Sequence, residues 1–365
     1  MKKLPLLIDA HEDLAWNMAT FQRDYTRPVA ESRRLERGTA IPGHSGDTLL
    51  GWDAYQQGRV AVVFATIFAA PMRANEGEWD TQCYLEDSQA ETLYRNQLDL
   101  YHRLVDQQPD KFRLIQTKMD LDETISAWEA ASDEAAHPPV GLVILMEGAE
   151  GIRSVDELSE WAASGVRLIG PAWEGTRYCG GTKEPGPLTK VGYQLLDAMA
   201  DQGLILDLSH MDEQAARQAL DHYPGTIVAT HSNAKALLPQ LDSNRNLSDG
   251  VIEGLIERGG VIGVVPYNLF LEENWAIGMR RELVSIQKVV DQIDHICQLA
   301  GDAKHVGIGS DFDGGFGWQS VPHEIDTVAD LQKLAPLLAE KGFSEADIAA
   351  IFGENWLGVL QSALP

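Results

Sequence analysis

The sequence predicts an α/β fold, a (β/α)8 TIM barrel with extra C-terminal helices. Short β-branched and apolar runs alternate with longer segments of helical period, which is typical of βα units around a parallel sheet. Eight such runs occur within 365 residues, which suits this barrel. No linker, internal repeat or low-complexity tract divides the chain. We therefore expect one domain over residues 1–365, with a doubly wound sheet as the alternative.

The eight runs are the expected strands, and turn residues bound them. In chain order they are LPLLI before Asp9, VAVVFATIF from Val60, VGLVILM from Val140, VRLIG from Val166, LILDL from Leu204, TIVAT from Thr226, VIGVV from Val261 and VGIGS from Val306. The helical candidates between them include ETLYRNQLDLYHRLV from Glu91, SVDELSEWAA from Ser154, VGYQLLDAMADQ from Val191 and ELVSIQKVVDQIDHICQLA from Glu282. DTVADLQKLAPLLAEKG and SEADIAAIFGENWLGVL predict two closing helices, the second opened by the S-x-x-D capping pattern of Ser344 and Asp347.

Charge and cysteine content exclude several classes of partner. The chain has 29 Lys and Arg against 55 Asp and Glu, and its net charge of -26 repels nucleic acid and anionic membranes. We therefore expect a small-molecule or peptide partner. Three distant cysteines indicate neither a disulfide framework nor a thiolate zinc site.

MKKLPLLID is too short for a secretory signal, and no apolar run could span a bilayer. We therefore expect a cytoplasmic protein, and we leave open whether it forms a homodimer.

Residues of metal-ligand type follow several of the expected strands. In this kind of barrel the active site forms at the carboxyl ends of the strands. The residues found there are His11 and Asp13 after the first strand, Glu147 after the third, His210 after the fifth, His231 after the sixth and Asp311 after the eighth. A single such residue is often a surface side chain or a helix cap, but this combination is hard to reach by chance.

The His-x-Asp pattern at the first strand has a geometric reason. Residues i and i+2 of an extended segment point to the same face, so His11 and Asp13 can reach one ion while Glu12 points away. The sequence therefore predicts a metal centre at this end of the barrel.

Longer stretches carry a resemblance to a known family. They are DAHEDLAWN, GRVAVVFATIF, LMEGAEGI, GPLTKVGYQLLDAMADQGLILDLSH, ATHSNA followed by NRNL, PYN at 266–268, and HVGIGSDFDG with FSEADIAAIFGENWL. The chain thereby resembles, nearly end to end, the membrane (renal) dipeptidases, peptidase family M19 of the amidohydrolase superfamily. DLSH, THS and GSDFDG at these spacings are together highly specific. The family is a zinc-dependent barrel that hydrolyses dipeptides, often tolerating a D-residue at the C-terminal position.

The resemblance implies a role for each matching residue. His11 and Asp13 resemble the ligands of one zinc ion, Glu147 the carboxylate that bridges two, and His210 with His231 the ligands of the second. Arg245 in NRNL resembles the arginine that holds the free carboxylate of the substrate, and Tyr267 in PYN is expected in the same substrate site. The resemblance thus implies two Zn²⁺ ions per chain and a dipeptide substrate.

This chemistry can also be argued from the residues. Two zinc ions bridged by a carboxylate can share a water and lower its pKa, which supplies a bridging hydroxide. Asp311 is then expected to move its proton to the leaving amine, and Asp313 is interpreted as a loop-ordering acid. The fourth strand ends in VRLIGPAW without a metal-bridging lysine, and no G-x-S-x-G occurs, so a serine nucleophile is poorly supported.

One position departs from the family. Renal dipeptidases carry a substrate-contacting histidine after the fourth strand, where this chain has Trp173, which stacks or donates an N–H but cannot be protonated. The arginine-rich stretch 24–37 is expected to be a solvated loop, or to overhang the site and attract acidic substrates.

We expect a dipeptidase for L-Xaa-L-Xaa and L-Xaa-D-Xaa. The alternatives are a binuclear amidohydrolase for N-acyl amino acids, cyclic amides or lactones, and a non-catalytic metal-binding barrel.

Overall fold

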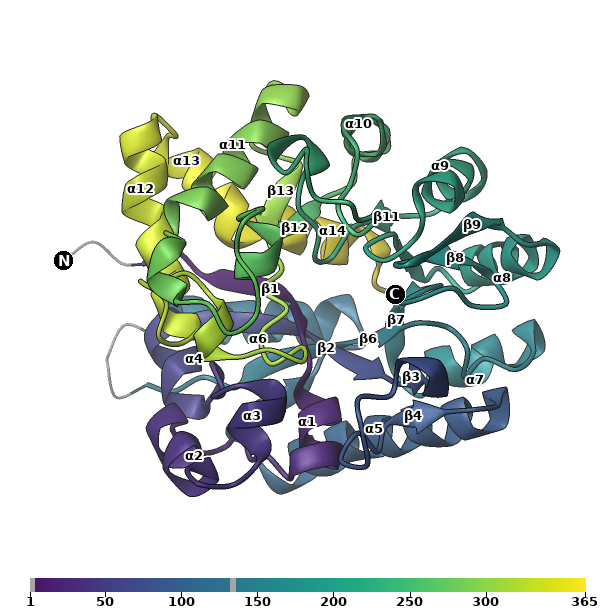
Figure 1. The fold of residues 1–365 in the computed structure, drawn as a ribbon, viewed down its shortest axis with the longest axis horizontal. Helices are drawn as coiled ribbons and strands as arrows, with labels where there is room; N and C mark the ends of the chain where they lie inside the picture. Colours follow the sequence, from purple (N-terminus) through teal and green to yellow (C-terminus); the bar gives the residue numbers. More distant parts are fainter. Residues whose placement is uncertain (1–3, 132–135) are drawn as a thin grey trace.

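The computed structural model describes residues 4–131 and 136–365, and its centre is a barrel of eight parallel strands (Figure 1). Around the barrel these are β1 (Leu7–Glu12), β2 (Val60–Phe68), β6 (Val140–Glu147), β7 (Val166–Gly170), β10 (Ile205–Asp207), β11 (Ile227–Val228), β12 (Ile262–Val264) and β13 (Val306–Ile308). β13 pairs with β1, and a parallel bridge between Ala229 and Ile262 links β11 to β12. The predicted fold class and all eight predicted strands are confirmed.

Helices surround the strands, as Figure 1 shows. After β2, the α-helices that lie between consecutive barrel strands are α5 (Asp87–Gln107), α6 (Lys118–Ala130), α7 (Leu158–Ala163), α8 (Lys190–Asp201), α9 (Glu213–His222), α10 (Asp249–Glu257) and α11 (Gln287–Ala300). Two predicted starts are too early. The segment from Ser154 first forms a 3-10 turn at Val155–Glu157, and the segment from Glu282 becomes an α-helix only at Gln287, after a 3-10 turn at Arg281–Leu283.

The two predicted closing helices are present, but both segments are interrupted. The first is a 3-10 segment (Val328–Lys333) followed by α12 (Leu334–Lys341). The second is α13 (Glu345–Ala349) and α14 (Asn355–Ala363), joined by a π-helical turn at Ala350–Glu354. The predicted capping box of Ser344 and Asp347 opens α13. Buried Trp356 of α14 donates from its indole to the carbonyl of Ile308 at 3.1 Å, which fixes this segment against β13.

The sequence patterns did not predict the short strands. β5 (Phe112–Leu114) extends the sheet beside β6, and two small sheets form in the loops, from β3 (Ala70–Pro71) with β4 (Cys83–Tyr84) and from β8 (Cys179–Gly181) with β9 (Glu184–Leu188). None of these strands exceeds five residues, so none carries a periodic apolar pattern of its own. Both small sheets belong to loops that leave the carboxyl ends of β2 and β7.

The N-terminal connection between β1 and β2 contains four short helices, α1 (Leu14–Phe21), α2 (Val29–Glu36), α3 (Ile41–Ser45) and α4 (Trp52–Gly58). The expectation of a loop over 24–37 is therefore wrong, because α2 occupies much of it, although its arginines are half-buried or exposed. The neighbouring Arg23 is buried. It pairs through Nε and Nη2 with both carboxylate oxygens of Glu36 at 3.0 and 3.1 Å, and its Nη1 lies 3.2 Å from Asp313. These contacts tie the connection to the loop after β13.

Across the two described ranges, no helix combines the length and the apolar character that crossing a membrane requires.

Candidate metal centre and active site

The residues predicted for the site meet at the carboxyl ends of the strands. A cavity of about 370 Å³ opens there, and seven of the predicted residues line it: Asp13, Glu147, Trp173, His210, Arg245, Tyr267 and Asp311. The remaining two, His11 and His231, are fully buried and contact Glu147. The strand ends therefore predicted the location of His11, Asp13, Glu147, His210, His231 and Asp311, and the family resemblance predicted that of Trp173, Arg245 and Tyr267.

The His-x-Asp pair behaves as its spacing predicts. His11 Nε2 lies 3.7 Å from Asp13 Oδ2 and 3.6 Å from Glu147 Oε2. Asp13 follows β1 directly, and its other oxygen accepts a hydrogen bond from the Thr66 hydroxyl at 2.5 Å. Glu12 points elsewhere and accepts from the Tyr55 hydroxyl at 2.6 Å. One oxygen of Glu147 thus faces a first group of ligand atoms.

The other oxygen of Glu147 faces a second group. Glu147 Oε1 lies 3.0 Å from His210 Nε2 and 3.4 Å from His231 Nε2, and the two ring nitrogens lie 3.0 Å apart. The Glu147 side chain is buried, and its contacts with His11, His210 and His231 outweigh the effect of burial and hold its pKa well below the usual range. Glu147 is therefore an ionised carboxylate with one oxygen directed at each group.

These residues fit a centre of two metal ions. His11, Asp13 and Glu147 form one set whose ligand atoms all lie within 4.8 Å of one another, and Glu147, His210 and His231 form another. The Nε2 atom of His11 is buried and has no hydrogen-bond partner within residues 4–131 and 136–365, although it points into a ring of carboxylates. The Nε2 atoms of His210 and His231 face each other at 3.0 Å. This arrangement suits two nitrogens that bind one cation better than a hydrogen bond between the two rings. Glu147 alone belongs to both of these sets.

The electrostatics of the histidines differ between the two groups. Burial opposes protonation of His11, but Glu147, Asp13 and Asp311 outweigh it and raise the pKa of this imidazole to about 9. For His210, burial and then Arg245 lower the pKa to about 4. Burial likewise lowers the pKa of His231 well below its usual value. His210 and His231 are thus neutral at physiological pH, as metal ligation requires.

Asp311 lies at the edge of both groups. Its Oδ1 is 3.9 Å from His11 Nε2, and it forms a third set of close ligand atoms with His11 and His231. Burial raises the pKa of Asp311 well above its usual range, and Asp13 and Glu147 raise it further. The backbone of Asp311 is left-handed, with φ of 59°, a conformation that non-glycine residues rarely adopt outside turns and functional sites.

Gly314 makes this arrangement sterically possible. A Cβ at this position would lie 2.3 Å from Asp311 Oδ1 and 2.7 Å from Asp13 Oδ2.

Asp313, by contrast, faces away from the cluster. It accepts hydrogen bonds from the Tyr25 hydroxyl at 2.8 Å, the Thr48 hydroxyl at 2.6 Å and the backbone N–H of Leu49 at 3.0 Å. Its place in the structure is that of a loop-ordering acid.

Arg245 is a fixed and incompletely paired cation in the wall of the cavity. Its Nη1 donates to the Ser209 carbonyl at 2.8 Å and the Ser232 hydroxyl at 3.2 Å, and its Nη2 donates to the His231 carbonyl at 2.7 Å. Its side chain is buried, and its Nε has no hydrogen-bond partner in the part of the chain that the structure describes. Main-chain carbonyls thus orient the guanidinium without neutralising its charge, which leaves it available to an anionic group of a substrate.

Aromatic side chains line much of the cavity. Those that contribute to its wall are Trp16, Phe68, Trp79, Trp173, Tyr267, Phe270 and Phe316. The Trp173 ring lies 5.0 Å from Phe68 and 6.2 Å from His210, and Tyr267 stacks on Phe316 with ring centroids 4.1 Å apart. Of these, only Trp173 and Tyr267 were predicted, because no sequence pattern shows that the other five rings face one cavity.

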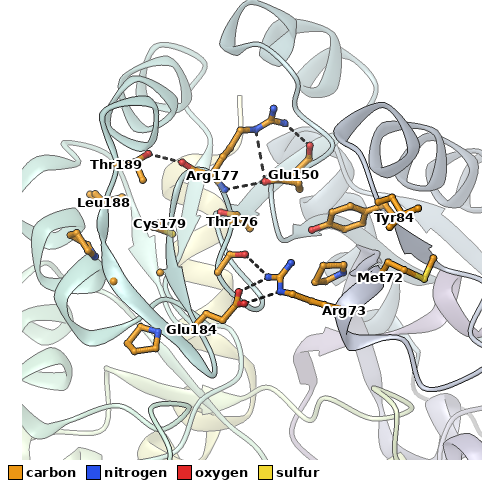
Figure 2. Close-up of a pocket in the computed structure, with 17 residues that line it drawn as sticks. Met72, Arg73, Tyr84, Glu150, Thr176, Arg177, Cys179, Glu184, Leu188 and Thr189 are labelled. Atoms are coloured by element: carbon orange, nitrogen blue, oxygen red, sulfur yellow. Dashed lines mark hydrogen bonds and ion pairs between the residues drawn. The ribbon is translucent and has the colours of Figure 1, made fainter.

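A larger and more open groove of about 840 Å³ lies between the loop after β2 and the β8–β9 hairpin (Figure 2). Its arginines are already paired, Arg73 with Glu184 and Arg177 with Glu150 (Figure 2). Arg73 also lies 3.5 Å from Glu174, which lines the smaller cavity. Within the described part of the chain, all three sets of close metal-ligand atoms belong to the barrel mouth and none to this groove.

Known proteins resemble this chain over most of its length. The model of peptidase family M19, membrane dipeptidase, matches residues 1–364. Dipeptidase ataJ of Aspergillus terreus is 30% identical over 391 residues, covering 97% of this chain and 84% of that protein. An uncharacterized protein in the pqqA 5' region of Klebsiella pneumoniae is 34% identical over 233 residues, covering 61% of this chain and 82% of that protein.

Among solved structures, a metallo peptidase from Rhodobacter sphaeroides, liganded with a phosphinate mimic of the dipeptide L-Ala-D-Ala, has a TM-score of 0.78 at 23% identity. The match covers 99% of this chain and 100% of that chain. A structure titled dipeptidase AC, of peptidase family M19, has the same TM-score at 24% identity and covers 99% of both chains. At these identities the likeness establishes the fold.

The geometry of Glu147 predicts the metal content. We expect zinc-saturated protein to hold two ions per chain, and His210→Ala to lose one of them preferentially, because its ring contacts only one oxygen of Glu147. Metal analysis after dialysis measures both. His222→Ala is the matched control, since this surface histidine pairs with Asp197 far from the site. At most one ion in the wild type, or equal loss from both positions in the variant, would contradict this division.

Proposed function

The chain belongs to the membrane dipeptidase family, peptidase family M19, and from this premise we propose that it hydrolyses dipeptides with two zinc ions at the barrel mouth. Membership makes it a hydrolase of the metallopeptidase class. The proposed substrates are L-Xaa-L-Xaa and L-Xaa-D-Xaa dipeptides. The mimic of L-Ala-D-Ala bound by the Rhodobacter sphaeroides relative supports the second kind.

The observation that carries this proposal is the position of Glu147, with one carboxylate oxygen facing each group of ligands. His11 and Asp13 would hold one ion, and His210 and His231 the other. Two zinc ions held there would supply an activated water as nucleophile and polarise the scissile carbonyl. The chain itself contributes a dry and rigid cluster of ligands, because all five side chains are at most one-tenth exposed.

Asp311 is the group proposed to move the proton. It lies in the cavity wall and contacts the ligand cluster through His11 at 3.9 Å, and no lysine or arginine among the described residues forms an ion pair with it within 4.0 Å. A carboxyl group with a raised pKa can accept a proton from the nucleophile and deliver it to the leaving amine within one reaction. A purely structural metal site would have no use for such a group, which argues against the non-catalytic barrel.

Arg245 is proposed to restrict the substrates to dipeptides. Its guanidinium is held by main-chain carbonyls beside His231, so a substrate carboxylate paired with it is anchored close to the metal ligands. Only one residue then fits between the anchored carboxylate and the scissile carbonyl. Peptides with a longer C-terminal part cannot place both groups at once.

Trp173 and its aromatic neighbours are proposed to favour apolar side chains in the substrate. The indole forms part of a wall with Phe68 beside His210 and cannot supply the positive charge of an imidazolium. An apolar side chain that covers this wall removes hydrocarbon surface from water on both partners.

The first kinetic prediction concerns Asp311→Asn. We expect it to keep both ions and the fold but to lower kcat by a factor on the order of 10² or more, because the amide cannot accept the proton. Metal analysis and steady-state kinetics measure the two effects. Asp313→Asn is the control. It should lower Tm, because Arg23 loses a buried ionic partner, and should leave the turnover of folded protein much closer to wild type. Full activity of Asp311→Asn would remove Asp311 from the proton path.

The second concerns the free carboxylate. Converting a dipeptide to its amide should lower kcat/KM about ten- to a hundredfold, because a charge-assisted contact with Arg245 worth roughly 1.5–3 kcal/mol is lost. Tripeptides should also be poor substrates. The Arg245→Ala variant should cleave the dipeptide and its amide equally slowly. If the wild type cleaves the amide as well as the acid, the dipeptidase proposal fails and hydrolysis of N-acyl amino acids or cyclic amides takes its place.

The third concerns Trp173. We expect the wild type to prefer dipeptides with an aromatic or long aliphatic residue over Ala-Ala, and Trp173→Ala to lose most of this preference while retaining both ions. The ratio of kcat/KM values for Phe-Ala and Ala-Ala, measured in both proteins, checks this. Trp173→His tests the family's residue at the same position. An unchanged ratio in Trp173→Ala would show that this wall does not contact the substrate side chain.

A further inference from the structure

One hydroxyl group lies between ligands of both proposed metal positions. The Thr230 Oγ1 atom is 3.2 Å from His11 Nδ1, 3.0 Å from His231 Nδ1 and 2.6 Å from Asp207 Oδ2. All four side chains are buried, so water does not compete for these contacts. No sequence pattern predicted a role for Thr230 or Asp207.

The direction of each hydrogen bond follows from counting protons. The Thr230 hydroxyl has one proton, and a carboxylate oxygen can only accept, so this proton goes to Asp207. The Ser209 hydroxyl likewise donates to the other oxygen of Asp207 at 2.6 Å, so it has no proton left for Thr230. The two lone pairs of the Thr230 oxygen then accept, one from each histidine. His11 and His231 must therefore both carry a proton on Nδ1.

When both imidazoles are neutral, as metal ligation requires, this tautomer leaves both Nε2 atoms with a free lone pair. The two rings are tilted by 35° with centroids 3.6 Å apart, and their Nε2 atoms face different oxygens of Glu147, at 3.6 Å for His11 and 3.4 Å for His231. His11 and His231 belong to different ligand groups. A single hydroxyl thus orients one ligand of each group.

We propose that Thr230, held by Asp207, is a positioning residue that fixes the metal-binding tautomer of His11 and His231 together and so couples the two metal positions. This rests on the proposed two-metal centre. The third histidine is held separately, because Thr182 Oγ1 lies 2.9 Å from His210 Nδ1 and belongs to the loop after β7. Groups that hold the outer nitrogen of a ligating histidine typically affect metal affinity by about 10- to 100-fold.

Asp207 offers an isosteric test of this proton arrangement. Its Oδ1 accepts from the backbone N–H groups of Ser209 and Thr230, at 3.0 and 2.9 Å, and from the Ser209 hydroxyl. In Asp207→Asn these three donors hold the amide oxygen at the Oδ1 position, and the NH2 group faces Thr230. The Thr230 proton must then turn to a histidine Nδ1, which moves that ring's proton to Nε2 and removes it as a ligand.

The experiment measures zinc stoichiometry and affinity in metal-buffered dialysis for the wild type, Thr230→Val, Thr230→Ser, Asp207→Asn and Thr182→Val. We expect Thr230→Val to bind both ions about 10- to 100-fold more weakly, Thr230→Ser to restore wild-type binding, and Asp207→Asn to weaken at least one ion to the same degree. Thr182→Val should weaken only one ion. Circular dichroism of the metal-free proteins verifies that each variant folds.

The outcomes separate this inference from the proposed function. A wild type that does not bind two ions would overturn the two-metal centre itself. If the wild type binds two ions, wild-type affinity for both in Thr230→Val, or loss of only one as in Thr182→Val, would overturn the coupling through Thr230. Should Thr230→Val fail to fold, Asp207→Asn decides, because unchanged affinity for both ions in that variant contradicts the proton arrangement.

Discussion

The burial of like charges at the carboxyl end of the barrel is the constraint on which the rest of the structure depends. Asp13, Glu147 and Asp311 all contact His11 Nε2 within 3.9 Å, where Coulomb repulsion between carboxylates is only weakly screened. Burial raises the pKa of Asp13 and Asp311, whereas three histidines keep Glu147 ionised. Such a cluster is costly to fold without compensating cations, and two divalent ions are the compensation that its ligand types and spacing suit.

The surrounding structure holds these charges in place. Hydroxyl groups of Thr66, Thr182 and Thr230 each contact a ligand side chain, so the orientation of the ligands does not depend on the ions alone. Farther out, Asp313 and Arg23 connect the loop after β13 to the long connection after β1. The two loops that carry Asp13 and Asp311 are thereby fastened to each other through a buried ion pair. The cavity at the barrel mouth consequently forms between segments that a buried ion pair connects.

How well the sequence predicted each element depended on the length and regularity of its apolar pattern. The eight barrel strands were predictable because parallel strands buried on both faces are continuous apolar runs. The five-residue or shorter strands of the loops have no such pattern, and the π-helical turn at Ala350–Glu354 interrupts a segment whose apolar period looks continuous. Composition predicted the solvent exposure of stretch 24–37 better than its backbone, because its arginines are half-buried or exposed while much of the stretch folds as α2. The neighbouring Arg23 is buried because Glu36 and Asp313 neutralise it.

The sequence by itself determined the fold class and the end of the barrel at which His11, Asp13, Glu147, His210, His231 and Asp311 would lie. It could do so because strand ends can be located along a chain, and all parallel strands in one barrel end on the same side. Only the tertiary structure decided which atoms face each other. Side chains far apart in sequence determine how Glu147 is divided between two ligand groups. They also determine the partners of Arg245 and the contact of Thr230 with two histidines. Such contacts carry no local signal, because they arise only when the barrel closes.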